Sequence, residues 1–258
     1  MDMNRKPLIL VSNDDGYQAA GVRRLMEWLA PFGDVVAVCP DSSRSGQSMA
    51  ITVNGALRVE RVAGYDGPGQ MYKSNGTPVD CIKLAMHNVL PRPADIVVSG
   101  INHGSNAAVN VVYSGTMGAA MEGCAFGLPA IGFSLTDHSP DADFSPAKSY
   151  VERIVAGVLE HGLPEGVCLN VNVPDISGEP EGMRLVRAAR GKWTDEYEEY
   201  TDPHGKKFYW LTGKFVNEEP ESEDTDEWCL AHRIVSVVPV MLDRTALKLE
   251  ELGWLAIH

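Results

Sequence analysis

The 258-residue sequence is poor in basic residues and has no long hydrophobic run. Lys and Arg number 22 against 35 Asp and Glu, a formal net charge of −13, and a surface of that sign repels the phosphate backbone of DNA or RNA. No segment approaches the roughly 18 consecutive apolar residues of a membrane span, and the apolar run at residues 8–11 is far too short for a signal peptide. We therefore expect a cytoplasmic protein that binds neither a nucleic-acid polymer nor a membrane.

Paired cysteines and the common nucleotide motifs are also missing. The five cysteines are widely spaced, without a C-x-x-C motif or a Cys/His pair at zinc-site spacing, so we expect free, buried thiols in a reducing compartment. The sequence has no P-loop, no G-x-G-x-x-G after the first predicted strand, no G-x-S-x-G elbow and no C-x5-R phosphate loop. These absences argue against triphosphate- and dinucleotide-dependent enzymes, typical α/β-hydrolases and cysteine phosphatases.

Short apolar runs alternate with amphipathic segments up to about residue 180. The apolar runs predict strands at 8–12, 35–39, 95–99, 129–135 and 167–173. The amphipathic segments predict helices at 21–32, 78–90, 114–124 and 146–161. This alternation is typical of a doubly wound α/β fold with a mostly parallel sheet.

After Pro174 the pattern changes. Strands are predicted at 185–189, 207–212 and 233–239, with no helix before residues 244–252, and residues 195–227 contain 12 acidic side chains against three lysines. We predict one domain over residues 1–258, with an α/β core at about 1–180. Residues 181–258 would form a β appendage and a terminal helix, and the appendage would be an oligomerisation arm or a lid.

Four polar segments carry the candidate chemistry, and three of them directly follow predicted strands, where open α/β sheets bind ligands. In the first, residues 12–16, the adjacent carboxylates of Asp14 and Asp15 repel each other unless a cation lies between them. Mg²⁺ prefers one or two carboxylates plus neutral oxygens and water. A polar loop with a helix cap is the alternative interpretation of this segment.

The other three segments offer further oxygen and nitrogen ligands. Residues 40–48 contain Ser45, a candidate hydroxyl ligand, and Arg44, which could meet a phosphate. In residues 99–106 the Asn102 carbonyl is a candidate ligand, the Asn106 amide a candidate anion donor, and His103 an alternative acid or base. Residues 113–118 begin a predicted helix, whose N-terminus is suited to an anion. An ordinary serine N-cap explains Ser114 equally well, so the joint occurrence of the four segments is the informative signal.

These segments, in this order, resemble the SurE family, the survival protein E nucleotidases. The matching stretches are LVSNDDG (10–16), RSG (44–46), GTPVDC (76–81), DIVVSGINHGSN (95–106), YSGT (113–116), AAMEG (119–123), LNVNVP (169–174) and YWLTG (209–213). The resemblance implies a metal-dependent phosphatase that releases phosphate from nucleoside 5′-monophosphates and also 3′-monophosphates. An exopolyphosphatase, or a phosphatase for another small phosphomonoester, is the alternative function.

The resemblance also implies a site, a fold and an assembly. One divalent ion per subunit, Mg²⁺ or Mn²⁺, is bound, and the core is Rossmann-like, with a C-terminal β segment exchanged between subunits in a homodimer or homotetramer. Asp14, Asp15 and Asn106 are the expected catalytic residues. The implied metal ligands are Asp14, Asp15, Ser45 and Asn102, and the implied phosphate-facing residues are Asn106, Ser114, Gly115 and Thr116.

The nucleophile and the specificity remain open at this stage. Attack by water is the preferred mechanism, and an aspartyl-phosphate on Asp14 or Asp15 is the alternative. A nucleotide-binding protein without turnover, or an assembly protein, are competing functions. The chain departs from the family pattern at Ala20, where proline is common, at Ala108, where glycine is usual, and at Asn110, which is often acidic. Residues 64–70 and 137–146 are the expected specificity loops.

Overall fold

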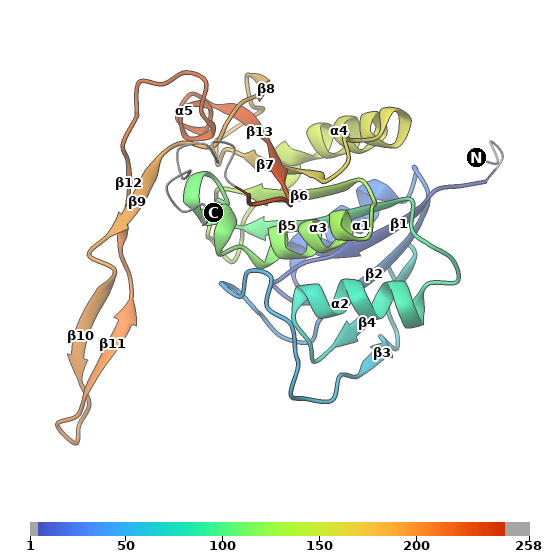
Figure 1. Cartoon of the computed structure of the whole chain (residues 1–258), viewed down its shortest axis with the longest axis horizontal. Coiled ribbons are helices and arrows are strands. Elements are labelled where there is room, and N and C mark those ends of the chain that lie inside the picture. Colours follow the sequence, from blue (N-terminus) through green and yellow to red (C-terminus); the bar gives the residue numbers. More distant parts are fainter. Residues whose placement is uncertain (1–4, 246–258) are drawn as a thin grey trace, which may run out of the picture.

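The computed structural model describes residues 5–245, and its centre is a nine-stranded sheet in the order β3-β4-β2-β1-β5-β6-β7-β13-β8 (Figure 1). The strands are β1 (Leu8–Ser12), β2 (Asp34–Pro40), β3 (Val59–Arg61), β4 (Gln70–Ser74), β5 (Ile96–His103), β6 (Ala130–Leu135), β7 (Val167–Val173), β8 (Gly182–Leu185) and β13 (Ile234–Met241). The run from β4 to β7 is parallel, whereas β3 and β13 are antiparallel to β4 and β7. The predicted α/β class with a mostly parallel sheet is confirmed.

Helices cover both faces of this sheet. The helices are α1 (Ala20–Leu29), α2 (Pro78–Leu84), which continues as a wider turn η1 (Ala85–Val89), α3 (Gly115–Ala125) and α4 (Lys148–His161), with short 3-10 turns η2 (Ala108–Val112) and η3 (Ser145–Ala147). Along β1, Ile9 and Val11 pack on the α1 and α4 side, and Leu8 and Leu10 pack on the α2 and α3 side. Burial on both faces explains why this strand is apolar throughout.

Two helix starts are fixed by their sequence. Thr77 and Asp80 form a capping box, in which Thr77 Oγ1 accepts from Asp80 N (3.1 Å) and Asp80 Oδ2 accepts from Thr77 N (3.0 Å). Ser114 caps α3, because its hydroxyl oxygen accepts from Met117 N at 3.0 Å. Small residues let α3 approach the sheet closely, and a Cβ on Gly123 would lie 2.6 Å from Val97 Cβ. These caps fix where α2 and α3 begin relative to the sheet edge.

The appendage is a long two-part hairpin that projects away from the core (Figure 1). Its base pairs β9 (Gly191–Thr194) with β12 (Lys214–Asn217), and its outer part pairs β10 (Tyr197–Thr201) with β11 (Lys207–Leu211). Every residue of β10 and β11 is exposed. The predicted β appendage is therefore present, with β9, β10 and β12 as additional strands.

Two predictions for this region need correction. The strand predicted at 185–189 is mostly wrong, because β8 ends at Leu185 and the following N–H groups of Arg187 and Ala189 donate to Asp224 and Asp226. The expectation of no helix before 244 is also wrong, since α5 (Asp226–Ala231) begins at the N-cap Thr225. The helix predicted at 244–252 lies mostly outside the described residues.

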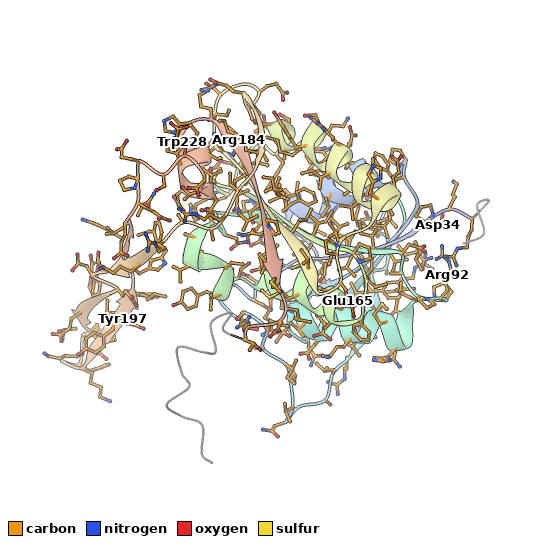
Figure 2. The ribbon with its side chains drawn as sticks, turned by 45° about the horizontal axis from the view of Figure 1, so that its top comes forward. Asp34, Arg92, Glu165, Arg184, Tyr197 and Trp228 are labelled. Atoms are coloured by element: carbon orange, nitrogen blue, oxygen red, sulfur yellow. The ribbon has the colours of Figure 1, made fainter. Side chains whose placement is uncertain are left out.

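α5 packs beside the last strands of the sheet. Figure 2 shows Arg184 and Trp228 close together, and Arg184 Cζ lies 5.4 Å from the centre of the Trp228 ring. This contact joins β8 to α5, and a cation over an indole face is a favourable arrangement. Each helix within residues 5–245 is too short or too polar to cross a bilayer.

Candidate active site

The carboxyl ends of the parallel strands border a cavity of about 630 Å³. Five of the eight predicted site residues line it: Asp14, Ser45, Asn102, Asn106 and Ser114. The edge of a parallel sheet is where open α/β folds bind ligands. The remaining three, Asp15, Gly115 and Thr116, do not line the cavity. They instead contact residues that do.

Asp14 is the most deeply placed carboxyl of the site, with 3% of its surface exposed. The Thr116 hydroxyl donates to Asp14 Oδ1, and a Cβ on Gly115 would lie 2.7 Å from Asp14 Cβ. Only glycine therefore allows α3 to begin this close to the end of β1. Burial, which is the largest cause, and the Asp15 charge raise the pKa of Asp14, and the Thr116 hydrogen bond lowers it; the net result is a pKa raised from 3.8 to about 6. A bound cation would reverse this effect.

Asp15 links the loop after β1 to the end of β5. Its Oδ2 accepts from His103 N (3.3 Å) and lies 3.2 Å from His103 Nδ1. The His103 ring meets Phe144 edge-on, with ring centres 5.0 Å apart. His103, the alternative acid or base, lines the cavity in this position.

Asn102 reaches the cavity through an irregularity in β5. The pairing of β5 with β6 shifts register between Ser99 and Asn102, and such bulges re-aim the side chains that follow. Gly100 has φ of +124°, and a Cβ there would lie 2.3 Å from Phe133 O. The expected end of this strand at residue 99 is wrong, since β5 continues to His103. Asn102 Nδ2 donates to Gly104 O at 2.8 Å, and this bond leaves its side-chain oxygen available to a cation.

Asn106 is fixed by a buried polar network that the sequence did not reveal. Asn172 Oδ1 accepts from Asn106 N, Asn170 Nδ2 donates to Asn106 O, and Asn106 Nδ2 donates to Ser134 Oγ, each at 2.8 Å. Asn172 Nδ2 also donates to Asn170 Oδ1 at 3.1 Å. The available signal was the pair of asparagines on alternate positions of an otherwise apolar strand. A satisfied network of this kind holds a side chain in one geometry.

The donor atoms suit a hard divalent cation better than zinc. Within residues 5–245, no three His, Cys, Asp or Glu side chains come together as a metal cluster. The cavity offers instead the Asp14 carboxylate, a hydroxyl and an amide oxygen, with the Asp15 carboxylate next to it in the chain, and Mg²⁺ takes such oxygen ligands together with water. Beside Asp14, the buried side-chain oxygen of Asn13 has no hydrogen-bond partner among the described residues. Because the donor set consists of oxygens, the residues fit the expected metal.

A second part of the cavity wall comes from segments with no predicted role. Trp193 of β9 and Phe215 of β12 line it, together with Glu227 and Leu230 of α5. Trp193 Nε1 donates to Asn110 Oδ1 at 2.8 Å. Asn110, one of the departures from the family pattern, thus contacts the base of the hairpin. These four wall residues lie far along the chain from the predicted segments, the last of which ends at Gly118, so spacing gave no signal for them.

Three expectations about surrounding residues have different outcomes. Arg44 does not line the cavity, because its guanidinium donates to Asp41 Oδ1 (3.3 Å) and Asn75 O (3.1 Å). Residues 64–70 border a separate cavity, whereas His138 from the 137–146 loop lines the main one. All five cysteines are free and buried, as predicted.

Fold and cavity define an α/β protein with an oxygen-rich site at the carboxyl edge of its parallel strands. Residues 9–195 match the family model for survival protein SurE. The curated 5′-nucleotidase SurE of Phocaeicola vulgatus is 49% identical over 241 residues, which is 93% of each chain. The protein of the same name from Bacteroides fragilis is 49% identical over 243 residues, or 94% of each chain. The crystal structure of the SurE protein from Aquifex aeolicus superposes with a TM-score of 0.82 at 35% identity, covering 96% of this chain and 99% of that one. The chain belongs to the SurE family.

Proposed function

We propose that this protein is a divalent-metal-dependent phosphatase that hydrolyses nucleoside 5′-monophosphates to nucleoside and phosphate, and that it also accepts 3′-monophosphates. The observation that carries the proposal is the meeting of buried Asp14 with Ser45 and Asn102 around one cavity. The name 5′-nucleotidase SurE, carried by relatives that match over more than nine-tenths of the chain, supports the choice of substrate.

Asp14, Asp15, Ser45 and Asn102 are the proposed ligands of one Mg²⁺ or Mn²⁺ per subunit. When bound, the cation supplies positive charge to the phosphoryl oxygens and lowers the pKa of a water molecule. Local positive charge is needed here because the chain carries a net charge of −13 and would otherwise repel a phosphate.

Asn106 and the start of α3 are the proposed phosphate-binding groups. Asn106 Nδ2 has one hydrogen in its bond to Ser134 and a second available for a phosphoryl oxygen. The Ser114 hydroxyl accepts from Met117 N and keeps its own hydrogen for donation. Donors placed in this way stabilise the charge that develops on the transferred phosphoryl group.

Water is the proposed nucleophile. Asp14 Oδ1 already accepts from Thr116, and Asp15 Oδ2 accepts from His103 N, so each carboxylate has one oxygen engaged and another proposed for the metal. An aspartyl-phosphate on Asp14, trapped by rapid quench and found by mass spectrometry, would overturn this assignment.

The hairpin supports the proposed homodimer or homotetramer. It exposes large apolar side chains, among them Tyr197 (65% exposed; labelled in Figure 2), Trp210 (63%) and Leu211 (68%). Exposed apolar surface of this kind marks interaction sites.

The five free, buried thiols support the cytoplasm as the place of action.

The test is phosphate release from 5′- and 3′-nucleotides and from polyphosphate, with Mg²⁺, Mn²⁺ or EDTA. We expect release that requires metal and prefers 5′-nucleotides, and a loss of about 100-fold or more in Asp14→Ala. Asp34→Ala is the matched control, because Asp34 is exposed and outside the cavity, and it should keep full activity. Preference for polyphosphate would favour the exopolyphosphatase alternative, and no release under any condition would leave a nucleotide-binding protein.

A further inference from the structure

Two histidines line the cavity, His103 and His138, and their ring nitrogens have different surroundings. His103 Nδ1 lies 3.2 Å from Oδ2 of Asp15, a proposed metal ligand. Within residues 5–245, the polar contacts of histidine rings belong to His103, His161 and His232, and none belongs to His138. His138 is also exposed. Its ring nitrogens are therefore available to a bound molecule and can exchange protons with solvent.

The loop that carries His138 is fixed on both sides of this residue. Gly104 N donates to Leu135 O at 2.8 Å and to Asp137 O at 2.9 Å, which ties the end of β6 to the end of β5. After His138, the N–H of Ser139 donates back to Asp137 Oδ1 at 2.7 Å. Loop residues that a rigid sheet positions in this way are often functional.

The imidazole ring of His138 lies against Gly104. A Cβ at Gly104 would lie 2.2 Å from His138 Cε1 and 2.5 Å from Nδ1, and the φ of +96° also favours glycine. In the chain, Gly104 stands midway between Asn102, a proposed metal ligand, and Asn106, a proposed phosphate donor. Asn106 Nδ2 in turn donates to Ser134 of β6, the strand that leads to His138. The ring is thus placed beside the segment that joins the two groups proposed to hold the phosphate.

Hydrolysis of a nucleoside monophosphate also requires a proton for the leaving oxygen. When water attacks phosphorus, the ester bond breaks and its electron pair stays on the ribose oxygen, which is a strong base as an alkoxide. A positioned acid speeds such a step by roughly 100- to 10,000-fold. The groups assigned so far do not supply this proton, because Asp14 and Asp15 are proposed for the metal and Asn106 and Ser114 for the phosphoryl oxygens.

We propose that His138 is the general acid that protonates the leaving ribose oxygen. The attacking water forms its bond to phosphorus, the ester P–O bond breaks, and the ribose oxygen takes the proton of the His138 imidazolium. One proton of the attacking water passes to solvent, and the neutral imidazole regains a proton from solvent before the next turnover. The inference rests on the proposed function and deepens it by adding a catalytic residue.

A matched pair of substrates tests this role. The first is AMP, and the second is its analogue in which sulfur replaces the bridging 5′-oxygen, so that a thiolate leaves without needing a proton. With Mg²⁺, His138→Gln should lower kcat for AMP about 100-fold and kcat for the sulfur analogue less than about threefold. Free imidazole should restore part of the AMP activity of His138→Ala. A residue that only shapes the cavity would affect both substrates alike.

Two other histidines supply the comparison variants. His161 is exposed at the end of α4 and does not line the cavity, so His161→Gln should keep both rates. His103→Gln alters a contact of Asp15 and should slow both substrates by the same factor. Loss that is selective for AMP in His103→Gln, with equal loss in His138→Gln, would assign the acid to His103 and overturn the inference.

A binding measurement and the wild-type rates separate this inference from the proposed function. Mg²⁺ should raise the Tm of His138→Gln as much as that of the wild type, because His138 is not a proposed metal ligand. Equal loss of activity on both substrates in His138→Gln, or no loss on AMP, would overturn the acid and leave the phosphatase intact. No phosphate release from either substrate by the wild type would overturn the phosphatase, and the acid with it.

Discussion

Replacing Asp14 with asparagine should stabilise the metal-free protein while it removes a proposed metal ligand. The carboxyl is buried, and this burial raises its pKa from 3.8 to about 6. Asparagine has nearly the same shape and no charge. Its side-chain oxygen can still accept the hydrogen bond that Thr116 donates to Asp14. The variant therefore removes the cost of a buried charge and leaves the packing intact.

The size and the sign of this effect follow from the two pKa values. Asp14 binds its proton more tightly in the folded state than in the unfolded state. The contribution of this proton to the free energy of unfolding is therefore fully present below pH 3.8 and is lost as pH rises to about 6. Above pH 6 the ionised carboxylate costs about 3 kcal/mol in the free energy of unfolding. For a protein of this size each kcal/mol shifts Tm by about 2–4 °C. Asp14→Asn should thus raise Tm by about 6–12 °C at pH 7 in EDTA.

The assay is calorimetric unfolding in EDTA at pH 7 and pH 4, with Asp66→Asn as an exposed control. At pH 4 the difference between wild type and Asp14→Asn should fall below about 1 kcal/mol. Adding Mg²⁺ at 100 times its Kd should stabilise the wild type by about 2.7 kcal/mol and the variant by much less. Equal Tm values at pH 7, or a difference of the same size at both pH values, would refute the reasoning.

Three further changes test the support of the site and the fold. Asn172→Ala removes the oxygen that accepts from Asn106 N. Urea unfolding should therefore show that the free energy of unfolding falls by about 2 kcal/mol, and kcat should fall at least about tenfold. If neither value changes, the network does not hold Asn106 in place. Ala108 has φ of +51°, and Ala108→Gly should gain about 0.5–1 kcal/mol in the same assay, because the left-handed conformation costs alanine more than glycine loses in chain entropy. A loss of stability would argue against that backbone. Thr77→Ala should cost about 1 kcal/mol through the lost cap of α2, and Thr77→Ser should restore most of it.

The central strands could be predicted from sequence because a strand that is buried on both faces appears as a short run of mostly apolar residues. The strands predicted at 8–12 and 167–173 coincide with β1 and β7, which are buried almost throughout and lie inside the sheet. Strand β4 (Gln70–Ser74), which lies between β2 and the short edge strand β3, was missed. Only Met71 and Ser74 of this strand are buried, so its sequence reads as a polar loop.

The hairpin and α5 were harder to predict because neither sequence carries a clear periodic pattern of apolar residues. Every residue of β10 and β11 is exposed, so no alternation of apolar and polar residues marks them. α5 spans only six residues, which is too short for a helical period to be recognised. Predicting strands in this segment was correct in kind, but the number of strands and their pairing required the three-dimensional structure.

The two parts of the cavity differ in the same way. The loops after β1, β2 and β5 could be brought together from sequence, because parallel strands place their carboxyl ends at one edge. Trp193 and Glu227 reach the same cavity from a hairpin and a short helix, and no rule of sheet topology places either segment there. The Asn172 contact to Asn106 joins residues 66 positions apart. It too depends on the packed fold.

A buried carboxylate connects these two parts of the cavity. Asp226, with no exposed surface, accepts at Oδ2 from Ala108 N and at Oδ1 from Ala189 N and Glu227 N, each at 2.8 Å. One side chain thus fixes the loop that follows Asn106, the strand connection that enters the hairpin, and the helix that carries Glu227. Because a buried carboxylate must keep its hydrogen-bond donors, these three segments cannot move independently without a large cost. The hairpin base, which lines the cavity, is therefore held in one frame with α5 and with the loop that follows Asn106.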